Sequence, residues 1–274
     1  MTERNAAAAL GVRSMRRVVV LAAMAAAGLG LDASTNVAHG QAHDAVPSTA
    51  PATQPATAPS DDFGPGVRVD AQHGVIELDA EVVLTEGWLE TLACAPQTKE
   101  HESILRIATP PRTVHAALVS LGARPGSPLR VVSLEDGTLD IRPPTGDRVR
   151  VELVHEVDGA VVVTPAGAWV RNRVTGEPLA DSVWVFAGSA VRRFQGQEVY
   201  LGDREGVTIS LVNFGADVLA RATRQTDANA DHDMAWVVNT EAVPPVGTRV
   251  VVRLTPLPPR LAPLPAGPDG MAAE

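Results

Sequence analysis

The residues best suited to chemistry lie in one short segment and on the element that follows it. The segment reads Lys99-Glu100-His101-Glu102-Ser103, and a second histidine, His115, comes shortly afterwards. Lys99 is the single lysine among the 23 basic residues of the chain. Because lysine differs from arginine chiefly in its compact, titratable amine, this position indicates a need for that amine. We take these six residues as the candidate binding site.

Two kinds of chemistry are open to these side chains. His101, His115 and Glu102 are the ligand types that a divalent transition metal prefers. Alternatively, His101 could act as a base towards Ser103, as in a hydrolase. The hydrolase interpretation lacks a Gly-x-Ser-x-Gly turn and an evident oxyanion hole. A third interpretation is structural, with a charged turn whose side chains bond to the loop and a histidine at a packing boundary.

The elements around the segment decide whether its side chains can meet. If 99–103 is extended, Lys99, His101 and Ser103 share one face. Residues 110–121 predict a helix, with Thr109 as N-cap and Gly122 as C-terminal stop. Packing of this helix on the sheet would place His115 at the boundary, near His101. Its apolar stripe consists of Val114, Ala117, Leu118 and Leu121.

Short β-branched segments, separated by Gly, Pro and Asp, fill most of the remaining chain between residues 66 and 256. Their alternation predicts strands; in one of them Val149, Val151 and Leu153 share a face. A second helix is predicted at 216–222. The predicted strands are 75–84, 89–95, 103–108, 130–133, 149–156, 160–164, 168–173, 182–191, 198–201, 208–213, 235–239 and 249–254.

The order of these elements predicts an α+β fold. We expect a mainly antiparallel or mixed β-sheet with one or two helices packed on one face. Strands 89–95 and 103–108 with helix 110–121 are matched by strands 183–191 and 208–213 with helix 216–222. The layout therefore suggests a pseudo-repeat of strand-strand-helix units.

The N-terminus is typical of a secretory signal. Four arginines precede an uncharged apolar stretch at 18–31, and Gly40-Gln41-Ala42 supplies small residues for cleavage after Ala42. The stretch is shorter than the roughly 18–20 residues that span a bilayer, although retention as an anchor remains the alternative. We expect an exported protein, periplasmic or extracellular, with membrane contact only through an uncleaved signal.

Composition sets further limits on the class of protein. Residues 43–65 and 257–274 are rich in proline and predict a disordered linker and tail around a globular domain at 66–256. Without residues 1–42 the net charge changes from −9 to −11, which disfavours nucleic acid as a partner. Cys94 is the only cysteine and lies in an apolar strand, so we expect a buried thiol.

Several stretches resemble the YdjY-type domain of exported bacterial proteins. Lys99-Glu100-His101-Glu102-Ser103 is the most specific of them, and the resemblance covers nearly the whole predicted domain. The other matching stretches are 115–118, 121–122, 125–126, 184–189, 210–214 and 239–247. The resemblance supports the domain boundaries and the choice of segment, and it implies no activity.

Two hypotheses from different classes follow. The first is a non-enzymatic domain that binds a small ligand, a divalent metal or a protein partner through 99–115. The second is a periplasmic hydrolase, either metal-assisted or of the Ser/His type. We favour the first, and we assign no catalytic residue.

Overall fold

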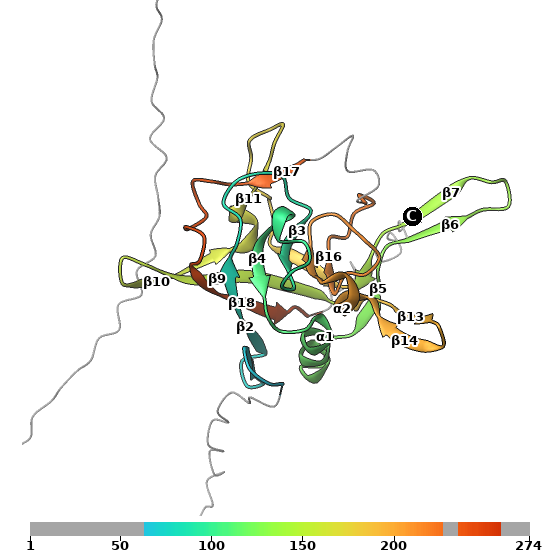
Figure 1. The fold of residues 1–274 in the computed structure, drawn as a ribbon, viewed down its shortest axis with the longest axis horizontal. Coiled ribbons are helices and arrows are strands. Elements are labelled where there is room, and N and C mark those ends of the chain that lie inside the picture. The colour runs from blue at the N-terminus through green and yellow to red at the C-terminus, as the bar shows by residue number, and fades with distance from the viewer. Residues whose placement is uncertain (1–62, 227–234, 259–274) are drawn as a thin grey trace, which may run out of the picture. The chain divides into compact units, whose positions relative to one another are not determined.

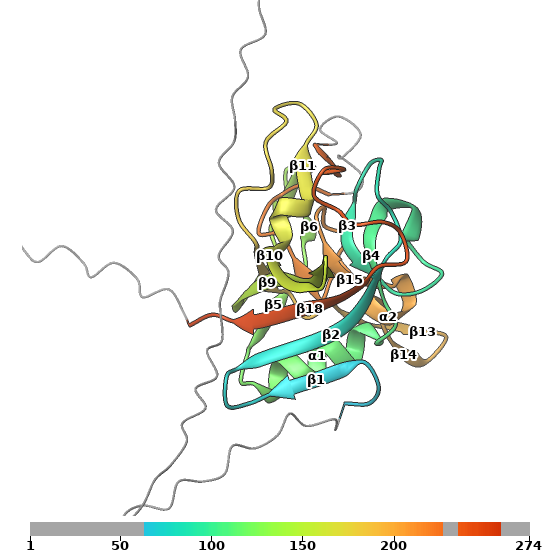
Figure 2. The same ribbon diagram turned by 90° about the vertical axis from the view of Figure 1, so that its left-hand side faces the viewer.

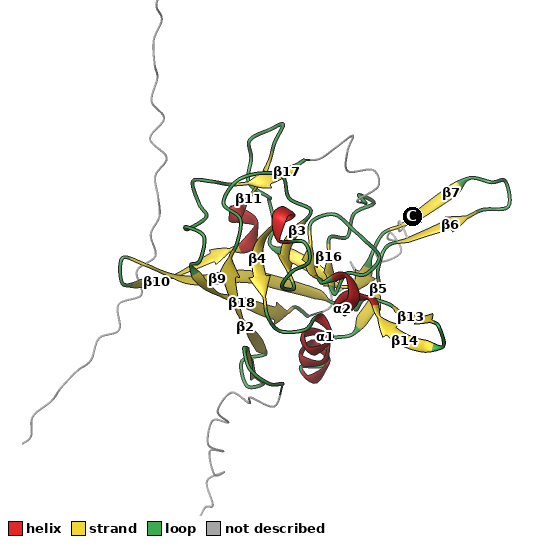
Figure 3. Ribbon diagram, in the orientation of Figure 1, coloured by secondary structure: helices red, strands yellow, loops and turns green. Residues whose placement is uncertain are grey.

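The computed structural model describes residues 63–226 and 235–258, and strands dominate it (Figure 1). Two α-helices, α1 (Pro111–Ser120) and α2 (Leu201–Glu205), and two 3-10 turns, Glu100–Glu102 and Ala166–Trp169, complete the regular structure (Figure 3). The strands are β1 (Val67–Asp70), β2 (Val75–Val82), β3 (Thr91–Cys94), β4 (Ser103–Ile107), β5 (Pro125–Ser127), β6 (Arg130–Ser133), β7 (Leu139–Arg142), β8 (Thr145–Gly146), β9 (Arg148–Val157), β10 (Ala160–Pro165), β11 (Val170–Asn172), β12 (Val183–Phe186), β13 (Val191–Phe194), β14 (Gln197–Tyr200), β15 (Val207–Ser210), β16 (Leu219–Ala220), β17 (Trp236–Val238) and β18 (Arg249–Pro256).

Eight strands close into a barrel, in the order β2-β18-β9-β12-β16-β15-β3-β4 and back to β2. The β15–β16 and β3–β4 pairs are parallel, and the other six pairs are antiparallel. Closure satisfies the backbone groups that an open edge would leave unpaired.

The long strands β2 and β9 each have one edge that pairs with two different strands along its length. On β2, residues 75–78 pair with β1 and residues 80–82 pair with β4. On β9, residues 148–150 pair with β12 and residues 152–157 pair with β10. In Figure 2, β1, β2 and β18 lie side by side, and α1 is seen behind β1 and β2. The strands β1 and β10 extend the sheet beyond the barrel.

Alternation along the strands fills the barrel with apolar side chains. Val149, Val151 and Leu153 are fully buried, as their spacing predicts. Trp184 on β12 is also fully buried, and its indole N–H donates to the Ser210 carbonyl at 2.7 Å. A buried indole needs such an acceptor, so the backbone of β15 fixes this ring.

The predicted helix at 110–121 is confirmed as α1, which buries Val114, Ala117 and Leu118. It ends in a Schellman motif, in which Gly122 (φ +82°) donates to Val119 and Ala123 donates to Leu118. The N-cap differs from the prediction: Pro110 occupies it, and no side chain caps the helix from within the segment.

The predicted fold is confirmed in part: the structure is mainly β, with a mixed sheet that closes into an eight-stranded barrel and few short helices, so its helical share is smaller than an α+β fold implies. The predicted helix at 216–222 is absent: the side chain of Asp217 holds the backbone N–H groups of Phe214 and Gly215, and Leu219–Ala220 forms β16. The predicted pseudo-repeat required that helix, so the repeat is not formed either. The expectation of a mixed sheet is confirmed.

Candidate functional site

Lys99 lies at the centre of a partly buried charged cluster. Its ammonium donates to Glu102 Oε1 at 2.5 Å and to Glu90 Oε2 at 3.3 Å. It also lies 4.2 Å from the ring centre of Phe214. The side chains of Lys99, Glu90 and Glu102 are only 24%, 13% and 17% exposed. We call these four residues the Lys99 clasp.

The backbone holds the clasp in place from two directions. Glu90 directly precedes β3, and its N–H donates to the Glu102 carbonyl at 3.1 Å. Its own carbonyl accepts from Leu211 and Val212, at 2.8 and 3.0 Å. The clasp therefore ties the turn at 99–102 to the loop that follows β15.

Charge in the clasp favours a protonated amine. Desolvation lowers the pKa of Lys99, but hydrogen bonds and attraction from Glu102 and Glu90 outweigh it and leave the pKa raised. Desolvation and the neighbouring Glu102 raise the pKa of Glu90, although Lys99 opposes this. An amine held as ammonium cannot act as a nucleophile, so the single lysine serves as a compact cation.

The segment is not extended, contrary to the prediction. Glu100–Glu102 forms a 3-10 turn, which separates the side chains of His101 and Ser103. His101 is 78% exposed, with Nε2 at 3.7 Å from Glu102 Oε2. Ser103 is fully buried and donates to the Leu105 carbonyl at 2.9 Å. The Ser/His pair that a hydrolase needs is not formed.

Glu100 is paired with an arginine and Cys94 is buried, so both side chains have structural roles. Glu100 Oε1 accepts from Arg106 at 3.2 Å, and Arg106 also bonds to Glu81 at 3.1 Å. Cys94 is buried, as predicted, and desolvation raises the pKa of its thiol. A thiol with a raised pKa in a dry site is a poor nucleophile.

His115 lies in a different cluster. Its Nδ1 is 3.0 Å from the Gly188 carbonyl and 3.1 Å from the Tyr200 hydroxyl, which donates to the same carbonyl at 3.1 Å. Because a carbonyl only accepts, the contact with Gly188 is a hydrogen bond in the tautomer that carries the proton on Nδ1. The imidazole also packs edge-on against Phe186, with ring centres 4.9 Å apart.

The three metal-ligand candidates are not gathered. His101 and Glu102 lie on the 3-10 turn, whereas His115 bonds to Gly188 and Tyr200. Within residues 63–226 and 235–258, no group of three or more His, Cys, Asp or Glu side chains is arranged to hold a metal ion. The structure therefore does not bring His101, Glu102 and His115 together as one metal site.

A cavity of about 570 Å³ adjoins the clasp through Phe214. Asn213 and Gly215 line it from the same loop, Leu201 from the start of α2, and Arg192 from β13. Residues 128–132 also line it. The cavity could not be predicted from the sequence, because its walls come from five segments and no local pattern links them.

Asp217 shapes the loop that carries Phe214. Its buried carboxylate accepts from the N–H groups of Phe214, at 3.1 Å, and Gly215, at 3.0 Å. Burial raises the pKa of Asp217 to about 6, although these bonds act in the opposite direction. The backbone of 217–218 also bonds to Gly188 and Ser189, which joins this loop to the His115 cluster.

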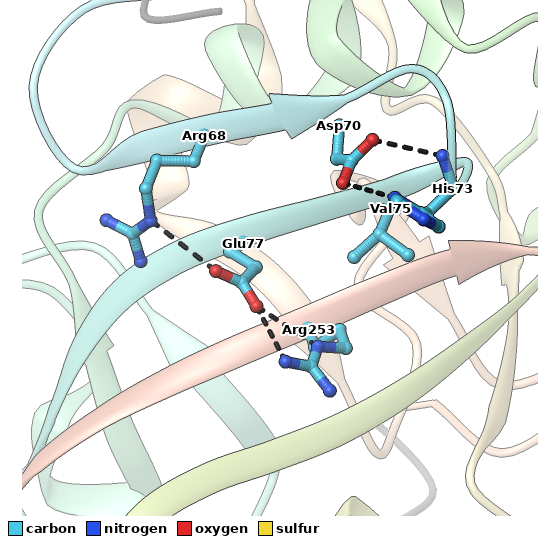
Figure 4. Close-up of a pocket in the computed structure, with 6 residues that line it drawn as sticks. All are labelled: Arg68, Asp70, His73, Val75, Glu77 and Arg253. Carbon is cyan, nitrogen blue, oxygen red and sulfur yellow. Dashed lines mark hydrogen bonds and ion pairs between the residues drawn. The ribbon is translucent and has the colours of Figure 1, made fainter. Parts of the chain in front are cut away.

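A second concentration of charge lies on the outer face of β1, β2 and β18 (Figure 4). Glu77 accepts from Arg253 at 2.8 Å and, at 3.5 Å, from Arg68, so one carboxylate lies between two guanidinium groups. Nearby, His73 Nδ1 is 2.6 Å from Asp70, and this bond lowers the pKa of Asp70. These partners satisfy one another, as cross-strand ion pairs do on a sheet surface.

Some predictions concern parts of the chain outside the described residues. The signal at 1–42, nearly all of the 43–65 linker and residues 259–274 of the tail belong to them. Across residues 63–226 and 235–258, no helix has the length and apolar character that a membrane crossing requires.

Comparison with known proteins gives one match. A search of curated proteins and a search of solved structures each find no match. The model of the YdjY domain matches residues 67–255, which include the Lys99 clasp and all of the barrel strands except Pro256, the last residue of β18. The chain therefore belongs to the YdjY domain family.

Proposed function

We propose that this protein is an exported, non-enzymatic binding domain whose small-ligand site is the cavity beside Phe214. The observation that carries the proposal is the position of Phe214. Its ring contacts Lys99 and also lines the cavity of about 570 Å³. The segment with the most distinctive sequence thus supports one wall of a ligand-sized space.

The clasp supports binding better than catalysis. Its amine is a held cation, Ser103 is buried against a carbonyl, and His101 is largely exposed. A catalytic site needs a nucleophile and a base within hydrogen-bonding reach. A binding site needs only a fixed wall. Lys99 is held by its ion pairs with Glu90 and Glu102, and its contact with the Phe214 ring fixes that wall.

Export is proposed from the sequence of the first 42 residues. A charged start, an apolar stretch and small residues before the expected cleavage point support it.

A neutral fluorescent dye tests the cavity without presuming charge on the ligand. Nile red titrated into the full chain should bind saturably at one site, since most of the lining is apolar. Ala190→Trp, which adds an indole at the cavity wall, should weaken binding at least tenfold. Val161→Trp, on the exposed β10, is the matched control and should leave binding unchanged.

The proposal fails on either of two results. One is the absence of saturable dye binding to the folded wild-type chain. The other is equal dye affinity in the Ala190→Trp and wild-type chains, because the dye would then occupy another surface.

A further inference from the structure

We infer that the cavity selects a small amphiphilic carboxylate, in which an apolar chain carries an anionic head with an N–H group beside it. This inference rests on the proposed function, since it names the ligand class of the same site. Three observations carry it: apolar walls, two arginines without partners, and one buried acceptor without a donor.

The apolar walls come from three places in the chain. Leu129, Val131 and Val132 lie at and before β6, Leu201 begins α2, and Phe214 lies on the loop after β15. Removing a chain of several methylene groups from water against such walls is favourable by about 0.8 kcal/mol for each group. The walls therefore suit an aliphatic or aromatic body.

The charged part of the lining has one sign. Arg130 on β6 and Arg192 on β13 line the cavity, and no acidic residue does. Among the residues that the structure describes, neither guanidinium has a hydrogen-bond or ion-pair partner. Neighbouring arginines do: Arg142 bonds to Asp140 at 2.9 Å and Arg193 to Glu198 at 3.5 Å.

The acidic residues on the strands that pair with β6 and β13 are already engaged: Asp140 on β7 pairs with Arg142, and Glu198 on β14 pairs with Arg193. A guanidinium matches a carboxylate with two parallel N–H groups. A carboxylate head between Arg130 and Arg192 would pair both.

Asn213 adds the third observation. It is 1% exposed and lines the cavity, and its Nδ2 donates to the carbonyls of Thr223 and Gln225, both at 3.0 Å. Its Oδ1 is buried and, within the described chain, accepts no hydrogen bond. A buried acceptor without a donor is costly, and a ligand N–H would satisfy it.

Three matched compounds separate these contributions in calorimetric titrations of the full chain. N-octanoylglycine has the chain, the carboxylate and the N–H. Its methyl ester lacks the charge, and N-octanoylsarcosine lacks the N–H. We expect one site for the acid, about tenfold weaker binding of the ester and at least threefold weaker binding of the sarcosine compound.

Variants assign the charge preference to the named arginines. Arg130→Gln and Arg192→Gln should each weaken binding of the acid about fivefold and leave the ester unchanged. Arg193→Gln is the matched control, because it is adjacent on β13, is paired with Glu198 and is not among the lining residues. It should leave both affinities unchanged.

The outcomes separate the two proposals. Equal affinity for acid and ester, or equal losses in Arg192→Gln and Arg193→Gln, overturns the inference. If Nile red binds in an Ala190-dependent manner but the acid does not bind, the inference fails and the binding function stands. If neither compound binds the folded chain, both proposals fail.

Discussion

A single lysine acts in this protein as a partly buried counter-ion. Lys99 lies between Glu90 and Glu102 and against the Phe214 ring, and its pKa is raised. An arginine in its place would need space for a planar guanidinium. This explains why a chain with 23 basic residues has a lysine at this position alone.

Removing the ammonium should destabilise the fold. In Lys99→Met, Glu90 and Glu102 would face each other without a cation in a partly buried site. We expect the free energy of unfolding at pH 7 to fall by about 1–3 kcal/mol in urea titrations. His101→Ala is the control, since its largely exposed imidazole should contribute less than about 0.5 kcal/mol. Equal losses in the two variants would contradict a stabilising clasp.

The site was predictable only in part, because its partners are remote in sequence. The rarity of lysine singled out Lys99, and the segment around it contains two of the four clasp residues, Lys99 and Glu102. Glu90 and Phe214 come from other strands and carry no local signal. His101, Ser103 and His115 were joined by assuming an extended strand, and the 3-10 turn at Glu100–Glu102 invalidates that geometry.

Among the elements, α1 is held at both ends by groups outside its own segment. At its start, Asp203 of α2 accepts from the backbone N–H of Arg112 at 2.8 Å and forms an ion pair with its guanidinium. At its end, Gly122 closes the helix in a left-handed conformation. A cap from a distant helix replaces the predicted Thr109 cap.

Loss of the distant cap should cost as much as loss of a local one. We expect Asp203→Ala to lower the free energy of unfolding by about 1–2 kcal/mol. Glu205→Ala, on an exposed position of the same helix, should change it by less than about 0.5 kcal/mol. Thermal and urea unfolding would measure both. If Glu205→Ala lowered the free energy of unfolding as much as Asp203→Ala, the loss would come from α2 in general. The result would then contradict a specific capping role for Asp203.

Elements with clear periodicity were predictable and short elements were not. The burial of Val149, Val151 and Leu153 follows from alternation, and α1 follows from its apolar stripe. At 216–222, the composition suits a helix, but the Asp217 carboxylate bonds to backbone N–H groups and the next residues pair with β12 and β15. Side-chain bonds to the backbone compete with helix formation in this way.

At the scale of the whole molecule, two buried groups give opposite responses to pH. Burial lowers the pKa of His155, which packs on Trp169 with Nδ1 unpaired among the described residues. Below pH 6.5 the unfolded chain therefore binds more protons, and this group makes stability fall as pH falls. Asp217, with its pKa raised to about 6, makes stability fall as pH rises through 6.

The two responses should separate in single variants. Between pH 7 and pH 5, the wild-type chain should show a shallow change in the free energy of unfolding. Relative to it, His155→Leu should gain stability on acidification, because the opposing contribution of His155 is removed. Asp217→Asn should lose stability on acidification relative to the wild type, because the contribution of Asp217 is removed while that of His155 remains. Urea titrations at several pH values would measure these slopes, and identical slopes in all three chains would contradict the assignment.

Closure of the barrel also determines the order in which the chain can become folded. β18, near the end of the chain, lies between β2 and β9, which pair with it over most of their lengths. Until residues 249–256 are present, the ring has a gap between β2 and β9. Long-range pairing of this kind slows folding.

Protease resistance should therefore arise late and all at once. A chain truncated after residue 247 should remain sensitive to protease, and a synthetic peptide of residues 248–258 added in trans should restore resistance. Early resistance in the truncated chain would show that the seven other strands hold together without it. If the gap persists as expected, the barrel of each newly made chain stays open until β18 pairs with β2 and β9. The time for which the chain is exposed to protease then depends on how quickly β18 pairs.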